Sequence, residues 1–290
     1  MSDLNILVTN DDGIDSVGLR VLATAMRRFG EVAVVAPDSE YSGAGASIGP
    51  LHLMETEIHR VHVDGVETAW TVNGPPALCV FYARMGAFEF TPDIIVSGIN
   101  PGANLGRAVY HSGTIGAVLT GRSAMIPGIA VSQSFAEPLD DSERARLDYD
   151  ERVSRQLWDS AAEVAAQVVA GMVESDFDDV AVVNLNVPNL PVEEMKGWRW
   201  TEVGLTPPWA MTEARLVPRP QPGGGAGGGD PADVTYGVET SWGEQRQQPP
   251  ETDAAAILDD MISISMLSRL TAVPVDAPAI DARLDEMLDR

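Results

Sequence analysis

The chain has 290 residues, of which 43 are Asp or Glu and 19 are Lys or Arg, so its formal net charge is −24. This balance argues against a protein that binds nucleic acid or an anionic membrane surface, because phosphate groups are held by Lys and Arg. Hydrophobic residues make up 44% of the chain and charged residues 21%, which indicates a globular protein, and the single cysteine excludes both an intrachain disulfide and a cysteine-based zinc site.

The N-terminus carries no secretory signal pattern, and no apolar run reaches the ~18 residues that a membrane helix needs, so we expect a cytoplasmic protein without a membrane span.

Residues 5–9 form an apolar run that ends in Asn-Asp-Asp-Gly at 10–13, which predicts a buried strand followed by a loop. Residues 16–28 carry apolar side chains at helical spacing, and residues 31–36 predict a second strand. This order predicts a β-α-β unit with parallel strands.

The next part of the chain continues the alternation. Residues 51–72 carry alternating apolar side chains, which predict antiparallel strands or a hairpin around Asp64 and Gly65. We then expect a helix at 76–87, a strand at 94–97, a helix at 112–121 and a strand at 129–132. The first ~135 residues therefore predict a doubly wound, mostly parallel sheet.

The second half predicts one more β-α-β passage and an irregular arm. The expected elements are a helix at 151–173, a strand at 180–187, a helix at 254–260 that Thr252 and Asp253 cap, a strand at 261–267 and an acidic helix at 279–289. The Gly- and Pro-rich residues 218–232 cannot build a core, so we expect a loop there. The predicted division is an α/β core over 1–200, a glycine-rich arm over 201–250 and a C-terminal helix and strand segment over 251–290.

Polar side chains gather at the predicted carboxyl ends of the strands, where open α/β sheets bind ligands. They are Asp11 and Asp12 after the first strand, Ser42 after the second, Asn100 and Asn104 after the strand at 94–97, and Ser112, Gly113 and Thr114 at the next helix start. Two adjacent carboxylates at a buried sheet edge are costly unless a cation compensates their charge. Oxygen ligands favour Mg²⁺, Mn²⁺ or Ca²⁺ over zinc, and Ser42 and Asn100 can add neutral oxygens.

The Ser-Gly-Thr turn at 112–114 favours an anion, because free backbone N–H groups, the helix dipole and two hydroxyls meet there. A cation site beside an anion site predicts metal-assisted phosphoryl hydrolysis. Each motif also has a purely structural interpretation: Asp-Asp-Gly and Asn-Pro-Gly are common turns, and Ser-Gly-Thr is a good helix N-cap. Their coincidence at one predicted sheet edge favours the functional interpretation.

Several motifs follow one another in a specific order along residues 4–270. They are Thr9-Asn10-Asp11-Asp12-Gly13, Ala36-Pro37-Asp38 with Ser42-Gly43-Ala44, Asn73-Gly74-Pro75-Pro76, Ser97-Gly98-Ile99-Asn100 with Gly102-Ala103-Asn104-Leu105-Gly106, and Ser112-Gly113-Thr114, with weaker matches at Leu185-Asn186-Val187-Pro188 and Thr252-Asp253-Ala254. Through these motifs the chain resembles the SurE family, the stationary-phase survival protein nucleotidases.

The resemblance implies a three-layer α/β/α sandwich with a mostly parallel sheet, a β-hairpin arm and a C-terminal segment that is exchanged between subunits of a homodimer or homotetramer. It implies a phosphatase with its catalytic core in 1–200, which acts on nucleoside 5′- and 3′-monophosphates with one Mg²⁺ or Mn²⁺ per subunit. Short-chain polyphosphate is an alternative substrate. The family's residues map as follows: the catalytic and metal-binding pair onto Asp11 and Asp12, the further metal ligands onto Ser42 and Asn100, and the phosphate-side loop onto Asn104, Ser112, Gly113 and Thr114.

The chain departs from the family pattern at Pro75, which replaces a Thr, at His111, which replaces a Tyr, and at Tyr41, which replaces an Arg. These changes leave the preference for the base or the leaving group open. The sequence shows no obvious general acid for the leaving group, and His111 is the candidate. The charge of −24 disfavours long polyanions and favours mononucleotides.

Two other classes of phosphate chemistry fit the sequence less well. A receiver domain is a non-enzyme alternative that also binds Mg²⁺, but it needs an acceptor Asp where Asn100 stands and a lysine on its fifth strand, whereas Lys196 is the sole lysine. A haloacid-dehalogenase-like phosphatase needs two Asp separated by one residue, a spacing that Asp11 and Asp12 lack.

Overall fold

The computed structural model describes residues 4–53, 55–135, 149–175, 182–205, 211–219, 235–243, 246–268 and 278–287. A large sheet has the strand order β3-β4-β2-β1-β5-β6-β7-β11-β8, and β9 and β10 form a separate two-stranded sheet. The strands of the large sheet are β1 (Leu4–Thr9), β2 (Gly30–Pro37), β3 (Ile58–Arg60), β4 (Thr68–Val72), β5 (Ile94–Pro101), β6 (Gly128–Gln133), β7 (Val182–Val187), β8 (Trp198–Trp200) and β11 (Ile262–Met266).

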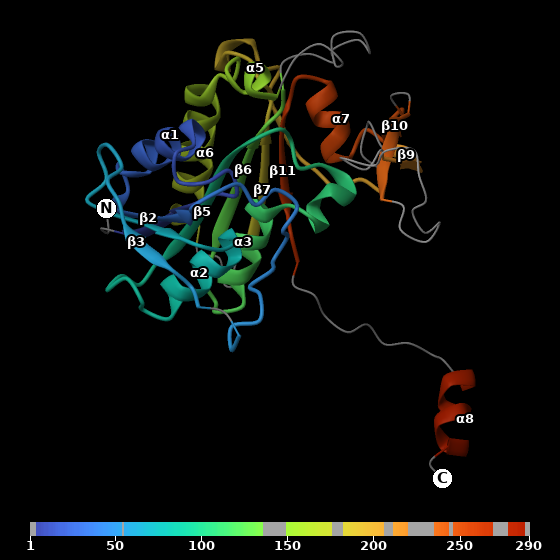
Figure 1. Ribbon diagram of the computed structural model, residues 1–290. Coiled ribbons are helices and arrows are strands. Elements are labelled where there is room, and N and C mark those ends of the chain that lie inside the picture. Colours follow the sequence, from blue (N-terminus) through green and yellow to red (C-terminus); the bar gives the residue numbers. More distant parts are fainter. Residues whose placement is uncertain are drawn as a thin grey trace, which may run out of the picture.

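Helices cover both faces of this sheet (Figure 1). The helices are α1 (Val17–Met26), α2 (Pro76–Arg84), α3 (Gly113–Arg122), α5 (Tyr149–Val153), α6 (Trp158–Glu174), α7 (Asp253–Leu258) and α8 (Pro278–Met287), with short 3-10 helices η1 (Gly106–Tyr110) and η2 (Val192–Glu194). On one face α1 packs against α6, and on the other α2 packs against α3. The architecture is therefore the expected three-layer α/β/α sandwich with a mostly parallel sheet.

Alternation along the central strands supplies one hydrophobic core to each face. In β1, Ile6 and Val8 join the core that includes Leu22 of α1, whereas Leu7 joins the core that includes Leu78 of α2. All five side chains are fully buried. A strand that is buried on both faces has a continuous run of apolar residues, and this is why the sequence predicted these central strands correctly.

Parallel pairing brings several strand ends to one edge. β1 pairs in parallel with β2 and β5, and Thr9 of β1 lies opposite Ser97 of β5. β5 and β6 are parallel, as are β6 and β7. The segments that follow β1, β2, β5 and β6 therefore leave the sheet at the same edge, which is where open α/β sheets bind ligands.

The single helix expected at 151–173 is wrong, because the structure has α5 and α6 with a break between them. Side chains from other segments bind the backbone of the break. Asn189 accepts a hydrogen bond from the Leu157 N–H and donates one to the Arg155 carbonyl, and Gln133 donates one to the Leu157 carbonyl. These tertiary partners replace the helical hydrogen bonds that the local pattern predicts.

The C-terminal segment is built partly into the main sheet. Thr252 caps α7 as expected, because its hydroxyl accepts a hydrogen bond from the Ala255 N–H. β11 follows α7 and lies between β7 and β8 of the same chain. Figure 1 shows α8 standing apart from the sheet.

The region expected as an irregular arm contains an antiparallel hairpin of β9 (Met211–Pro218) and β10 (Tyr236–Trp242), both labelled in Figure 1. This hairpin matches the arm that the family resemblance implies. Most of the predicted glycine-rich loop at 218–232 lies outside the described residues.

Among the described helices, none has both the length and the apolar character needed to span a bilayer.

Candidate metal and phosphate site

The carboxylate of Asp11 lies against the first turn of α3. Its Oδ1 accepts a hydrogen bond of 2.7 Å from the Thr114 hydroxyl, and the side chain is only 3% exposed. Burial raises the pKa of Asp11, while the Thr114 hydroxyl and the backbone N–H groups of Thr114 and Gly113 oppose that rise. The helix terminus thus favours the ionised carboxylate that desolvation disfavours.

Gly113 lets Asp11 approach the helix this closely. A Cβ at Gly113 would lie 2.8 Å from Oδ2 of Asp11, a separation that real Cβ atoms essentially never show. The glycine of the Ser-Gly-Thr motif therefore serves the contact between β1 and α3. Sequence reasoning assigned this turn to a phosphate and did not foresee the Asp11 carboxylate as its partner.

Asp12 is the second carboxylate of the pair, and its environment is unfavourable to its charge. Burial first, and then the charges of Asp11 and Glu40, raise the pKa of Asp12 to about 8. Its Oδ2 is buried and has no hydrogen-bond partner in the structure, and the same is true of Oδ1 of the fully buried Asn10. Buried oxygens normally have partners, so two such acceptors beside a repelling carboxylate pair fit a bound cation.

The types of side chain present restrict which cation fits. Across the described parts of the chain, no group of three or more His, Cys, Asp or Glu side chains is placed to hold a metal ion. A cation beside Asp11 and Asp12 would therefore take its other ligands from neutral oxygens or water. This donor set fits Mg²⁺ or Mn²⁺ and disfavours zinc.

Ser42 lies on the loop after β2, which backbone hydrogen bonds hold against the site. The Tyr41 N–H donates to the Asp11 carbonyl at 2.7 Å, and the Gly45 N–H donates to the His111 carbonyl at 3.0 Å. These two bonds attach the loop to the end of β1 and to the start of α3. Ser42 itself is exposed, and it follows Tyr41, whose N–H is bonded to the Asp11 carbonyl.

Asn100 and Asn104 lie after the apolar part of β5, and their amide groups are already oriented. The Asn100 Nδ2 donates to the Gly102 carbonyl at 2.6 Å, which leaves its Oδ1 as the atom for a ligand. The Asn104 Nδ2 donates to the Ser132 hydroxyl at 2.9 Å. Asn186 of β7 accepts from the Asn104 N–H, and Asn184 of β7 donates to the Asn104 carbonyl.

The remaining predicted residues lie around the first turn of α3. The Ser112 hydroxyl accepts a hydrogen bond from the Ile115 N–H, which is the N-cap interaction, and its own proton is still available to a phosphate. Thr114 has no exposed surface and donates to Asp11, so in this structure it positions the aspartate. His111 is exposed at the end of η1.

Asp253 ties the C-terminal segment to the site. Its Oδ2 accepts a hydrogen bond from the Gly106 N–H at 2.8 Å, and its Oδ1 accepts from the N–H groups of Gly204 and Ala254. Gly106 is two residues beyond Asn104. The fully buried carboxylate therefore fixes the loop that carries a predicted phosphate-binding residue.

Sequence reasoning gave Asp253, Asn184 and Asn186 no role in the site. The signal was present, because polar residues recur in a short strand that is otherwise apolar and buried, and because Thr-Asp-Ala forms one of the weaker family motifs. What the signal did not reveal was the partner of each side chain, since these contacts join distant parts of the chain.

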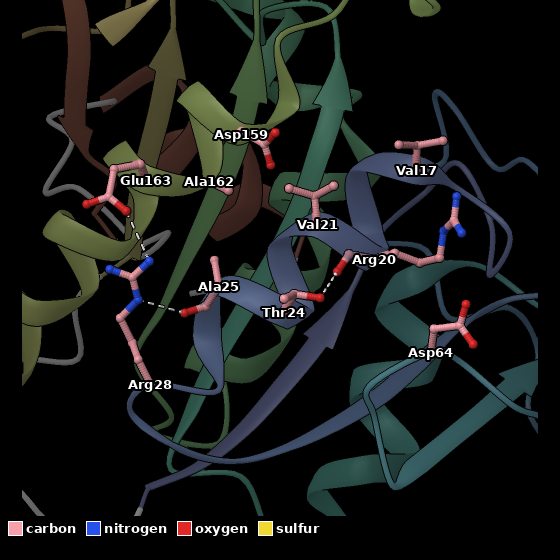
Figure 2. A pocket seen from close by; sticks show the side chains of 10 residues that line it. All are labelled: Val17, Arg20, Val21, Thr24, Ala25, Arg28, Asp64, Asp159, Ala162 and Glu163. Atoms are coloured by element: carbon pink, nitrogen blue, oxygen red, sulfur yellow. Dashed lines mark hydrogen bonds and ion pairs between the residues drawn. The ribbon is translucent and has the colours of Figure 1, made fainter.

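A cavity of about 700 Å³ lies elsewhere, between α1 and α6. Figure 2 shows Arg28 across this groove, bonded to Glu163 at 3.0 Å and to the Ala25 carbonyl, with Asp159 near the start of α6. None of the predicted site residues is among the described residues that line it. It is a groove between two helices, and the adjacent carboxylates Asp11 and Asp12 of the candidate site are not part of its lining.

The chain is similar to proteins of one family along most of its length. A sequence model of the family described as Survival protein SurE matches residues 6–207. The 5′/3′-nucleotidase SurE of Erwinia tasmaniensis is 32% identical over 264 residues, which cover 91% of this chain and 90% of that protein. The 5′-nucleotidase SurE of Stenotrophomonas maltophilia is 38% identical over 209 residues, which cover 69% of this chain and 70% of that protein.

The same family emerges from the comparison of structures. The crystal structure of the SurE protein from Aquifex aeolicus matches with a TM-score of 0.67 at 26% sequence identity, covering 98% of this chain and 99% of that one. The family match, the relatives and the fold agree with the motifs at residues 9–13, 97–106 and 112–114. The chain belongs to the SurE family.

Proposed function

We propose that the chain is a 5′-nucleotidase, a divalent-metal-dependent phosphomonoesterase that hydrolyses nucleoside 5′-monophosphates to nucleoside and phosphate. Nucleoside 3′-monophosphates are the second candidate substrate. The observation that carries the proposal is the pair Asp11 and Asp12 at the end of β1, with Asp11 held at the N-terminus of α3 and buried acceptors beside it. The names of the relatives, 5′-nucleotidase and 5′/3′-nucleotidase, support the same activity.

Asp11, Asp12, Ser42 and Asn100 are the ligands that we propose for one Mg²⁺ or Mn²⁺ per subunit. When bound, such an ion polarises a phosphoryl oxygen and lowers the pKa of a coordinated water. The support is the unpartnered Asp12 Oδ2 and the orientation of Asn100, whose nitrogen is already engaged with Gly102.

The other residues bind the phosphate and handle protons. The Ser112 hydroxyl, the first-turn N–H groups of α3 and the Asn104 amide donate hydrogen bonds to phosphate oxygens. One carboxylate of the pair, Asp12 or Asp11, accepts the proton of the attacking water, and the exposed His111 ring protonates the leaving oxygen. Thr114 keeps Asp11 oriented through its 2.7 Å hydrogen bond.

Release of phosphate from a panel of substrates tests this function. The panel contains nucleoside 5′-monophosphates, the 3′ isomers and short polyphosphate, each with Mg²⁺, with Mn²⁺ and with a chelator. We expect metal-dependent release from the 5′-monophosphates. Equal release in the chelator would contradict the metal site, and release from polyphosphate alone would favour the alternative substrate.

The assembly is also a proposal. We expect a homodimer or homotetramer in which the C-terminal segment is exchanged, and α8 is the element best suited to this role because it stands apart while exposing Ile280 and Met287. Light scattering of the full chain and of a chain ending at residue 268 tests it. The same number of subunits before and after truncation would exclude a role of α8 in assembly.

A further inference from the structure

An aromatic cluster lies beside the candidate site, at the end of β6. Phe135 follows β6, and its ring edge packs on Gly102, where a Cβ would lie 3.1 Å from the ring atom Cε2. Gly102 is the residue whose carbonyl accepts the hydrogen bond from Asn100. The Phe135 ring therefore lies directly on the turn that orients a proposed metal ligand.

Two side chains of α5 complete the cluster. The Arg152 guanidinium lies over the Phe135 ring, 3.8 Å from its centroid, and the Tyr149 ring meets Phe135 nearly edge-on, with centroids 6.3 Å apart and an interplanar angle of 77°. Phe135 is thus held by neighbours, whereas Tyr149 is 43% exposed. Tyr149 is the member of the cluster that can offer an aromatic surface to a ligand.

The charges of the aspartate pair also act on Tyr149. Partial burial, and then the negative charges of Asp12, Glu40 and Asp11, raise the pKa of the Tyr149 phenol. The phenol is therefore within electrostatic range of both aspartates and remains a neutral hydrogen-bond donor. Around it Asp150 adds further negative charge, which repels a second phosphate but not an uncharged ring.

These contacts define what kind of group fits beside the phosphate. A nucleoside monophosphate whose phosphate lies at Asp12 and Ser112 must place its sugar and base a short distance away. A nucleobase is uncharged and has a π-face that stacks on aromatic side chains, largely irrespective of which base it is. An exposed tyrosine beside a carboxylate-rich site suits such a base better than it suits a further anionic group.

We propose that Tyr149, supported by Phe135 and Arg152, is the stacking platform for the nucleobase of the substrate. This inference rests on the proposed nucleotidase function and assigns a residue to the nucleoside part of that substrate. Because stacking does not read the edge of the base, the platform accepts both purine and pyrimidine nucleotides, and the larger purine ring stacks more strongly.

The test compares substrates with and without a base. In Tyr149→Ala we expect the KM for adenosine 5′-monophosphate to rise on the order of tenfold, the effect of losing one stacked aromatic side chain, with kcat preserved. The kinetics of ribose 5-phosphate, which has no base, stay unchanged. Tyr149→Phe keeps the ring and retains the wild-type KM, and Trp198→Ala, an exposed aromatic on the edge strand β8, serves as the control.

The outcomes separate the platform from the nucleotidase function. An equal rise in KM for both substrates, or no rise for either, overturns the platform. If the wild type hydrolyses neither substrate, the nucleotidase proposal fails, and calorimetric binding of adenosine, which has no phosphate, then decides on the platform alone. Binding that weakens in Tyr149→Ala but not in Tyr149→Phe supports it, whereas no binding, or equal binding in all variants, overturns it.

Discussion

The hydroxyl of Thr114 donates a hydrogen bond of 2.7 Å to Oδ1 of Asp11, across 103 positions of the chain. Both side chains are buried, so neither can exchange this bond for one with water. The bond joins the end of β1 to the first turn of α3. It makes the helix terminus part of the environment of the carboxylate pair.

Replacing Thr114 by Val removes this donor with little change in shape. We expect the free energy of unfolding to fall by about 1.5–3 kcal/mol, the usual cost of losing a buried hydrogen bond to a charged group. Affinity for Mn²⁺ also falls, because Asp11 loses the group that orients it. Urea unfolding and calorimetric titration measure the two effects, and Thr114→Ser, which keeps the hydroxyl, is the control. A Val variant with wild-type metal affinity would show that Asp11 needs no such support.

Replacing Asp12 by Asn removes the charge and keeps the size of the side chain. We expect phosphate release from nucleoside 5′-monophosphates to be abolished, because one of the two carboxylates that hold the cation is lost. Circular dichroism is expected to stay unchanged. Asp15→Asn, at an exposed aspartate three residues away, is the matched control and retains activity. Full activity in Asp12→Asn would refute the assignment of the site.

The stability of the metal-free protein is expected to decrease as the pH rises. An unperturbed aspartate has a pKa of 3.8, whereas the pKa of Asp12 in the folded chain is about 8. Between these values the folded chain binds more protons than the unfolded chain, so the free energy of unfolding falls with rising pH. Melting temperatures in a chelator, at pH ~5 and pH ~8, sample this window.

Two comparisons isolate the contribution of Asp12 to that pH dependence. Asp12→Asn is expected to lose less stability over the same range, because the amide does not titrate. Added Mg²⁺ is expected to restore stability at the higher pH, since a ligand that binds only the folded state stabilises it. The same pH dependence in the wild type and in Asp12→Asn would assign it to other groups.

Asp253 is expected to affect the site through the loop that it holds. In Asp253→Asn an amide N–H₂ must face one of the backbone N–H groups that the carboxylate now binds. We expect a loss of about 1–3 kcal/mol in the free energy of unfolding, with faster hydrogen exchange at Gly106 and a higher KM. Asp259→Asn, at an exposed aspartate just after α7, is the control. Unchanged exchange at Gly106 would separate Asp253 from the site.

Local patterns predicted much of the fold. The buried strands at 5–9, 31–36 and 94–97 were recognisable from their continuous apolar runs, and Thr252 was recognisable as a helix cap. The prediction of a continuous helix at 151–173 was wrong, because Asn189 and Gln133 bind the backbone between α5 and α6. Helix propensity depends only on residues that are close in sequence, so it cannot account for hydrogen bonds from side chains that are distant in sequence.

The sequence by itself determined the family and the types of side chain at the carboxyl ends of the strands, because motif order and hydrophobic periodicity are local properties. Only the tertiary structure decided which groups meet: Thr114 with Asp11, Gly106 with the Asp253 carboxylate 147 positions away, and Phe135 with Tyr149. Those pairings depend on the path of the backbone through the whole sheet. The fold also sets the burial of Asp12 and its distance from Glu40, which together with the charge of Asp11 raise the pKa of Asp12.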